Sequence, residues 1–256
     1  MLKRKKLTIL IPCHNEEKGI GKVIDAVPMT ILKRFGFKVE IMVIDNNSTD
    51  HTAEIALAHR ATIIQAEKKG KGNAILAGFN SLSSDTRYVV MLDGDNTYKA
   101  KEIIRLVEPL VNNFCHVVVG SRLGGKMKKN SLQFKNRVAN WSYTFLVRQF
   151  YGANITDVLS GYFAWKKEVI DKLLPHLESE GFEIEMEMIT KMSRLGFTMY
   201  SVPITYDERE GKTKIEAIND GIRILKMFLK NLTWSPKEKK TKRAKRIIYR
   251  PIPWLS

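Results

Sequence analysis

The sequence predicts an α/β protein whose mainly parallel sheet carries helices on both faces. Three features of the 256 residues support this prediction. Apolar runs of strand length alternate with helix-like segments over the first half of the chain, and each run is nearly continuous, as in strands buried on both faces. Polar clusters follow three of these runs, at the sheet edge where parallel sheets bind ligands. With 44% hydrophobic residues, the chain can fold around a full core.

Short apolar runs predict five strands in the first half of the chain, at 7–12, 39–45, 61–66, 88–93 and 116–120. The segments between them have the pattern of helices, at 16–27, 52–59, 72–82 and 100–112. Asp50 and Thr52 offer side-chain oxygens that can cap the second of these helices. Such an alternation implies right-handed crossovers between parallel strands.

The alternation ends after residue 120, where the polar, glycine-containing stretch 120–131 is predicted to be a loop. Further elements are then expected in chain order: a helix at 133–151, a strand at 162–165, helices at 168–177 and 183–195, a strand at 197–205 and a helix at 215–232. Because no internal linker interrupts them, we predict one domain over 1–235 and a basic C-terminal extension over 236–256.

The formal charge of +16 is concentrated in three segments, 1–6, 120–150 and 236–256, and the rest of the chain is close to neutral. A basic surface attracts nucleic acid, an anionic membrane or an anionic substrate. Nucleic acid is not an expected partner, because the sequence holds no zinc-finger spacing, RNP pattern or heptad-backed basic helix. Aromatic residues interleave with the charge at 141–151, as in helices that lie in a membrane interface.

The sequence lacks an apolar run of the roughly 18 residues that cross a bilayer, and its N-terminus lacks the apolar core of a signal peptide. We therefore expect a cytoplasmic protein that associates peripherally with the cytoplasmic face of the membrane. For the run at 236–250, a solvated tail that only aids solubility is an equal alternative.

Polar clusters follow the first, second and fourth expected strands, and a parallel sheet would gather them at one edge. They are His14-Asn15-Glu16-Glu17, Asp45-Asn46-Asn47-Ser48-Thr49-Asp50 and Asp93-Gly94-Asp95-Asn96-Thr97. Each cluster alone could simply cap the helix that follows it. Three clusters together indicate a binding site.

Asp93 and Asp95 flank a glycine that lets the chain turn sharply, so both carboxylates can approach one hard divalent cation, Mg²⁺ or Mn²⁺. Such a cation would in turn bind phosphate oxygens. The same letters fit the Asp-x-Asp-x-Thr pattern of haloacid-dehalogenase-type phosphatases. Those enzymes carry the motif on their first strand and need a later acidic pair. Here it follows the fourth strand, and no such pair is evident.

Positive charge is available for a phosphate ligand. Lys69-Gly70-Lys71-Gly72-Asn73 precedes an apolar helix and looks like a phosphate cradle, although it fits neither the P-loop nor the dinucleotide spacing. Arginine forks also bind phosphate. The remaining candidates are Arg122, Arg137, Arg209, Lys212 and Lys214, each of which could equally be a solvated surface charge.

In this order, the clusters resemble the family 2 glycosyltransferases of the GT-A fold, a Rossmann-like architecture, and among them the polyprenyl-phosphate (dolichyl-phosphate) sugar synthases. The resemblance covers roughly residues 7–230. The residues of these motifs are most similar to those of archaeal enzymes of protein N-glycosylation. The matching segments are Ile11 to Glu17, Val43 to Asp50, Lys69 to Asn73, Asp93 to Asp95, Gly120 to Arg122, Asp157 to Gly161, Glu183 to Met186 and Arg209 to Lys214.

The resemblance implies roles for individual residues. Asp93 and Asp95 would hold the cation, and Arg209 would contact the donor diphosphate, which makes Asp95 and Arg209 the implied catalytic residues. Arg122 and Arg137 would bind the acceptor phosphate. The implied nucleotide-binding residues are Pro12, His14, Glu16, Asp45, Asn46, Lys71 and Asp93.

Two residues depart from the family pattern. Many relatives have a second acid where this chain has Asn46, and relatives with a third metal ligand have Gln where this chain has Thr97. The first departure weakens the assignment of the nucleotide base. The second leaves part of the metal shell open to water.

The implied activity is a metal-dependent transfer of a sugar, with inversion, from a nucleotide-sugar to a polyprenyl phosphate. An acceptor phosphate is ionised at neutral pH, so it needs no dedicated general base. UDP-glucose or UDP-N-acetylglucosamine is the favoured donor, with GDP-mannose as the alternative. A soluble family 2 transferase that acts on a small phosphate or a polysaccharide is the second functional hypothesis.

Overall fold

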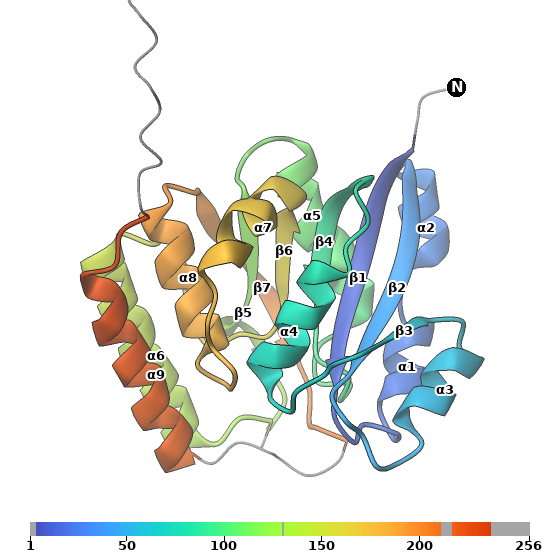
Figure 1. The fold of residues 1–256 in the computed structure, drawn as a ribbon, viewed down its shortest axis with the longest axis horizontal. Coiled ribbons are helices and arrows are strands. Elements are labelled where there is room, and N and C mark those ends of the chain that lie inside the picture. The colour runs from blue at the N-terminus through green and yellow to red at the C-terminus, as the bar shows by residue number, and fades with distance from the viewer. Residues whose placement is uncertain (1–3, 130, 211–216, 237–256) are drawn as a thin grey trace, which may run out of the picture.

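The computed structural model describes residues 4–129, 131–210 and 217–236. These residues form a seven-stranded sheet in the order β3-β2-β1-β4-β6-β5-β7, with helices on both of its faces (Figure 1). The predicted α/β class is confirmed. Most of the extension predicted over 236–256, together with Lys212 and Lys214, lies outside the described residues, so the domain division stays a prediction.

The sheet is mainly parallel. β1 pairs in parallel with β2 and β4, β2 with β3, and β5 with β7, whereas β6 runs antiparallel between β4 and β5. The register sets Cys13, at the end of β1, beside Asp45, at the end of β2, so the polar residues after these strands share one edge. The strands are β1 (Lys5–Cys13), β2 (Phe37–Asp45), β3 (Thr62–Gln65), β4 (Thr86–Met91), β5 (Val117–Met127), β6 (Phe163–Lys166) and β7 (Met199–Tyr206).

Alternating side chains of the strands supply two cores. Leu10 of β1 packs with α4, α7 and α8 on one face, while Ile9 and Ile11 pack with α1, α3 and α5 on the other. Trp165 is fully buried in the first core, with its ring 5.5 Å from that of Phe79. The helices are α1 (Ile20–Asp25), α2 (Met29–Arg34), α3 (Thr52–Ala58), α4 (Lys71–Asn80), α5 (Ile103–Val111), α6 (Phe134–Tyr151), α7 (Lys167–Leu173), α8 (Ile184–Arg194) and α9 (Ala217–Leu232).

Helices α6 and α9 lie side by side at one end of the molecule (Figure 1). The Tyr143 hydroxyl of α6 donates to the Gly221 carbonyl of α9 at 3.0 Å, and the Tyr151 hydroxyl donates to the Phe228 carbonyl at 2.6 Å. Within the described ranges, no helix is both long and apolar enough to cross a membrane.

Two predicted elements differ from the structure. The helix predicted over 16–27 begins at Ile20, because the turn before it holds Asn15 in the left-handed region (φ 53°), and a second short helix, α2, follows. The loop predicted over 120–131 is wrong in its first part, because β5 continues to Met127. A Cβ atom on Gly125 would lie 1.9 Å from the Ile204 carbonyl oxygen, so glycine lets β5 approach β7 there.

A buried ion pair supports the loop before α8. The Lys191 ammonium lies 2.6 Å from a carboxylate oxygen of Glu187, and both side chains are almost completely buried. The same carboxylate accepts hydrogen bonds from the backbone N–H groups of Glu178 and Ser179. Glu187 therefore fixes the backbone of the 178–180 segment.

We predict that Glu187→Gln lowers the free energy of unfolding by about 3 kcal/mol, because it leaves the Lys191 charge buried without its main partner. Urea denaturation followed by circular dichroism measures this change. The matched control is Asp171→Asn, which breaks the Lys167–Asp171 pair on the exposed side of α7 and should leave stability unchanged. Equal stability of the two variants would contradict the structural role of Glu187.

Candidate active site

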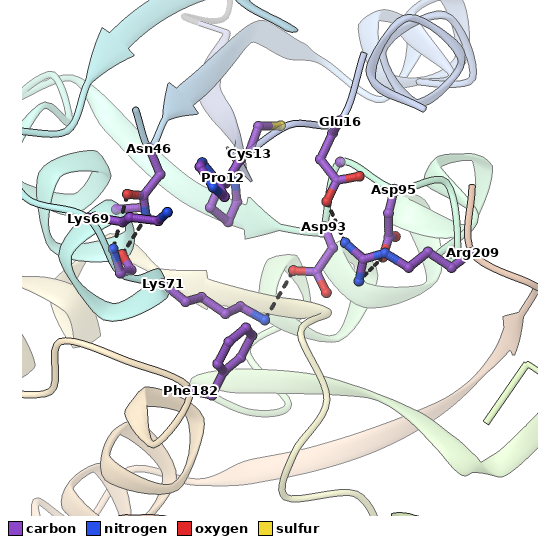
Figure 2. Close-up of a pocket in the computed structure, with 14 residues that line it drawn as sticks. Pro12, Cys13, Glu16, Asn46, Lys69, Lys71, Asp93, Asp95, Phe182 and Arg209 are labelled. Carbon is purple, nitrogen blue, oxygen red and sulfur yellow. Dashed lines mark hydrogen bonds and ion pairs between the residues drawn. The ribbon is translucent and has the colours of Figure 1, made fainter. Parts of the chain in front are cut away.

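A cavity of about 210 Å³ lies beyond the carboxyl ends of β1 and β4 (Figure 2). Eight residues that the sequence analysis assigned to the site line it: Pro12, His14, Glu16, Asn46, Lys71, Asp93, Asp95 and Arg209. They come from the ends of β1, β2 and β4, from the start of α4 and from the segment after β7. The parallel sheet therefore gathers at one edge the polar clusters that the sequence separates.

Asp95 is a buried carboxyl group, with only 2% of its surface exposed. Its Oδ1 atom accepts hydrogen bonds from the Thr97 backbone N–H at 3.1 Å and from the Thr97 hydroxyl at 2.6 Å. Burial and the neighbouring Asp93 raise the pKa of Asp95, against the opposing effect of Arg209. The Thr97 hydroxyl is therefore engaged in a hydrogen bond with Asp95 inside the 93–97 loop.

Arg209 joins two carboxylates from different parts of the sheet edge. Its guanidinium lies 3.1 Å from Oδ2 of Asp95 and also pairs with Oε1 of Glu16 (Figure 2). Burial opposes the charge, but Asp95 and Glu16 raise the pKa of Arg209 above its ordinary value. The Arg209 Nε atom is buried and has no hydrogen-bond partner among the described residues, so one donor is available for a ligand.

Backbone contacts hold the Arg209 segment in place. After β7, the Asp207 N–H donates to the Thr97 carbonyl at 2.9 Å, and the Glu210 N–H donates to the Asp95 carbonyl at 3.2 Å. The Glu210 carboxylate also accepts from the Asn96 amide at 2.9 Å. Arg209 is therefore tied to the same loop whose carboxylate it neutralises.

Lys71 forms a second bridge across the site. Its ammonium lies 3.2 Å from Oδ1 of Asp93 and 2.6 Å from Oε1 of Glu185. Although burial alone would lower the pKa of Lys71, these two carboxylates raise it above its ordinary value. Burial raises the pKa of Glu185, whose surface is 3% exposed. Phe182 lies beneath the Lys71 side chain, with the ammonium 5.8 Å from the ring centre.

The glycine-rich segment before α4 packs against protein backbone. Asn46 donates its side-chain amide to the Gly70 carbonyl and accepts from the Gly70 N–H at 3.0 Å. Gly70 has φ 133°, and a Cβ atom there would lie 2.2 Å from the Glu180 carbonyl oxygen. A Cβ atom on Gly72 would lie 2.1 Å from the Ser179 carbonyl oxygen. Gly70 and Gly72 are therefore required for close contact with the 179–180 segment. This contact positions Lys71, which lies between the two glycines, in the wall of the cavity.

Three residues assigned from the resemblance lie outside this cavity. Asp45 is buried beside it, where its carboxylate accepts from the Ser48 N–H at 3.3 Å. Arg122 is buried in a two-pronged pair with Asp157, with both N···O distances 2.8 Å. Arg137 is exposed on α6. Their roles toward base and acceptor stay predictions.

The sequence analysis assigned no role to Glu185 or Phe182. Glu185 belongs to the matching segment Glu183 to Met186, but its sequence position did not indicate that it faces Lys71. Within the described part of the chain, no group of three or more His, Cys, Asp or Glu side chains is arranged to hold a metal. A cation at this site would draw on the two aspartates, with its other ligands from substrate or water.

The fold is similar to that of solved glycosyltransferases. Glucosyl-3-phosphoglycerate synthase from Mycobacterium tuberculosis, solved with Mn²⁺, UDP and glucosyl-3-phosphoglycerate, superposes with a TM-score of 0.69 at 22% identity, over 91% of this chain and 82% of that one. At this identity the likeness shows the fold, which confirms the predicted GT-A architecture.

Curated relatives are similar over most of this chain. Glycosyltransferase AglJ from Haloferax volcanii is 32% identical over 89% of this chain and 73% of its own length. Low-salt glycan biosynthesis hexosyltransferase Agl6 from the same organism is 32% identical over 88% of this chain, which spans only 53% of Agl6. An undecaprenyl-phosphate mannosyltransferase from Micrococcus luteus is 28% identical over 82% of this chain and 87% of its own length. The model of glycosyl transferase family 2 matches residues 8–174, so the chain belongs to this family and is a glycosyltransferase.

Proposed function

We propose that the enzyme transfers a sugar from a nucleotide-sugar to a polyprenyl phosphate such as dolichyl phosphate. The observation that carries this proposal is the cavity in which two aspartates meet two partly exposed cations, Lys71 and Arg209. A donor diphosphate with its divalent cation needs both kinds of charge at one place. The names of three relatives, an undecaprenyl-phosphate mannosyltransferase, a dolichyl-phosphate hexose transferase and a polyprenol monophosphomannose synthase, support a lipid phosphate as acceptor.

Asp93 and Asp95 fit a divalent cation, because both carboxylates line the cavity and oxygen ligands suit Mg²⁺ and Mn²⁺. A bound cation would neutralise charge that develops on the leaving nucleoside diphosphate. Lys71 and Arg209 now hold these carboxylates. We infer that on donor binding the two side chains turn part of their hydrogen bonding toward the diphosphate, for which the Arg209 Nε donor is already available.

The nucleotide would occupy the part of the cavity formed by Pro12, His14, Glu16 and Asn46, beside Asp45. UDP-glucose or UDP-N-acetylglucosamine remains the favoured donor and GDP-mannose the alternative. The structural relative that was solved with UDP and Mn²⁺ supports a uridine nucleotide. The family match favours a transferase over the phosphatase that the Asp-x-Asp-x-Thr letters also allowed.

The reaction that this site supports is a single in-line displacement. An oxygen of the acceptor phosphate forms a bond to the anomeric carbon, and the bond from that carbon to the donor phosphate oxygen breaks. The electron pair leaves with the nucleoside diphosphate, and no proton needs to move because the acceptor is already ionised. Arg209 contributes by stabilising the departing charge. Inversion at the anomeric carbon follows.

A lipid acceptor requires access to a membrane, and we propose that two exposed apolar stripes provide it. α6 carries Phe134, Val138, Trp141 and Phe145, and α9 carries Ile218, Ile222, Leu225 and Leu229, all exposed and spaced by three or four residues along one helix face. Lys135 and Arg148 of α6 flank the first stripe. Apolar stripes with basic neighbours are typical of helices that lie on an anionic membrane. These stripes support the proposal that the enzyme associates with a membrane surface, for which the sequence analysis expects the cytoplasmic face.

A soluble acceptor is the second candidate, because the structural relative is a glucosyl-3-phosphoglycerate synthase, which acts on a small phosphate. The two apolar stripes favour the lipid, since a transferase with a small soluble acceptor has no need of them.

The transfer reaction is tested with purified protein, Mn²⁺, dolichyl phosphate in detergent and a panel of radiolabelled UDP- and GDP-sugars, by counting label that enters organic solvent. We expect extractable label from one donor and a loss of at least about 100-fold in kcat for Asp95→Asn, because the cation and Arg209 lose their shared carboxylate. The control Asp85→Asn removes an exposed carboxylate at the opposite end of β4 and should keep full activity. If no label becomes extractable, and label instead enters a small soluble phosphate added in place of the lipid, the acceptor is soluble and the lipid assignment is wrong.

Membrane association is tested by flotation with vesicles that contain anionic lipid. The double variant Trp141→Ser/Leu225→Ser should bind them several-fold more weakly, because each change removes an apolar group from one stripe. Phe35→Ser is the matched control, since Phe35 is as exposed as Trp141 but lies outside both stripes, beyond α2. Equal losses in the two proteins, or none in either, would contradict docking through α6 and α9.

A further inference from the structure

Arg209 and Glu210 are consecutive residues of opposite charge, and both pair with the stretch of chain that follows β1. The Arg209 guanidinium contacts the Glu16 carboxylate (Figure 2), and the Lys22 ammonium lies 2.5 Å from a carboxylate oxygen of Glu210. Glu16 precedes α1 and Lys22 lies within it. Two ion pairs of opposite polarity therefore fasten the 207–210 segment to this part of the chain at adjacent positions.

The 93–97 loop contacts both α1 and the 207–210 segment. A Cβ atom on Gly19, the residue before α1, would lie 2.6 Å from the Gly94 carbonyl oxygen, so glycine lets α1 approach the loop closely. Two backbone N–H groups of the 207–210 segment donate to other carbonyls of the same loop. The ion pair of Glu210 thus joins two neighbours of the loop directly to each other.

The Glu210 carboxylate has a second partner, in the loop itself. Its Oε1 atom accepts from the Asn96 amide at 2.9 Å, while its Oε2 atom accepts from Lys22. These two hydrogen bonds lower the pKa of Glu210 below its ordinary value, with Lys22 the larger cause. The Glu210 N–H also donates to the Asp95 carbonyl at 3.2 Å. Glu210 therefore contacts both α1 and the loop after β4.

A bound donor would disturb the contacts of Arg209 but not those of Glu210. Arg209 lines the donor cavity together with its two carboxylate partners, Glu16 and Asp95. Among the described residues, those that line this cavity do not include Glu210 or its two side-chain partners. A diphosphate can therefore draw Arg209 away from its carboxylates while the contacts of Glu210 remain in place.

We infer that Glu210 is a positioning residue that keeps Arg209 within reach of the donor diphosphate. It acts through its side-chain contacts with Lys22 and Asn96, which persist while Arg209 exchanges its carboxylate partners for the diphosphate. This inference rests on the proposed binding of a nucleotide-sugar and extends it to residues outside the donor cavity. Loss of these contacts would let the segment that carries Arg209 move away from the 93–97 loop.

Titration calorimetry of the full chain in Mn²⁺ tests this role, with whichever of UDP and GDP the wild-type protein binds. Lys22→Glu sets a second carboxylate against Glu210, and we expect the affinity to fall about threefold or more, because repulsion displaces the segment that carries Arg209. The matched control Lys18→Glu makes the same change of charge at an exposed residue just before α1 and should change the affinity far less. Equal losses in both variants would show a long-range effect of charge and overturn the positioning role.

A charge exchange and a second background sharpen the test. Lys22→Glu/Glu210→Lys brings opposite charges together again and should recover most of the affinity, because the Asn96 amide can turn its oxygen toward the introduced ammonium. In an Arg209→Met background, Lys22→Glu should have little further effect, since it acts through Arg209. The same fold-loss in both backgrounds would contradict this route.

Thermal unfolding distinguishes positioning from general stabilisation. The Lys22 side chain is 62% exposed and the Glu210 side chain 31% exposed, and ion pairs with such exposure contribute little to stability. Lys22→Glu should therefore keep nearly the Tm of the wild-type protein while its affinity falls. A large fall in Tm would assign Lys22 a structural role instead.

Hydrogen exchange tests the contact without any ligand. The Asp207 and Glu210 N–H groups donate to carbonyls of the 93–97 loop, so Lys22→Glu should speed exchange several-fold in a peptide that contains residues 207–210. Lys18→Glu should leave this peptide unchanged. Wild-type exchange in both variants would show that the ion pair does not hold the segment, and would overturn the inference.

The outcomes separate the two proposals. If the wild-type protein binds neither UDP nor GDP in Mn²⁺, the proposed function fails, while hydrogen exchange still tests the contact of Glu210. If it binds one of them, and Lys22→Glu binds it as tightly as Lys18→Glu does, the proposed function stands and Glu210 does not position Arg209.

Discussion

Asp95 is a buried carboxyl group next to a second carboxyl group, and its ionised form requires positive charge close by. Arg209 supplies that charge from the segment after β7, which backbone hydrogen bonds hold against Asp95 and Thr97. Lys71 does the same for Asp93 from the start of α4. Because neither cation is near these acids in sequence, the site exists only when the whole sheet is folded. For this reason the start of α4 and the segment after β7 both contact the loop at 93–97.

The ion pairs of Lys71 and Arg209 with the two aspartates also bear on how the site would bind its substrates. Lys71 and Arg209 keep the aspartates compensated before any ligand arrives, which avoids the large cost of an unpaired buried charge. A cation bound to the aspartates would take over this compensation and leave both side chains to the donor diphosphate. Glu185 would then retain Lys71 at a fixed position, 2.6 Å away, instead of releasing it to solvent.

Much of the site was predictable because a parallel sheet places the ends of its strands together. His14, Asn46 and Asp95 could be assigned to one edge because each follows an expected parallel strand. Side-chain partners were not predictable, since a sequence pattern places a residue on an element without showing what it faces. The pairing of Arg122 with Asp157 and of Lys71 with Glu185 depends on how distant elements pack. The continuation of β5 was hidden because Gly124 and Gly125 are typical of loops, whereas here glycine allows close strand contact.

The central claim is that a divalent cation and a donor diphosphate bind together at Asp93 and Asp95. Titration calorimetry of the wild-type protein with UDP and with GDP, each in Mn²⁺ and in EDTA, tests it without an acceptor or a membrane. We predict that one nucleoside diphosphate binds in Mn²⁺ and that its affinity falls by at least about tenfold in EDTA, because the aspartates then repel the phosphates. Equal affinity in Mn²⁺ and EDTA would contradict it.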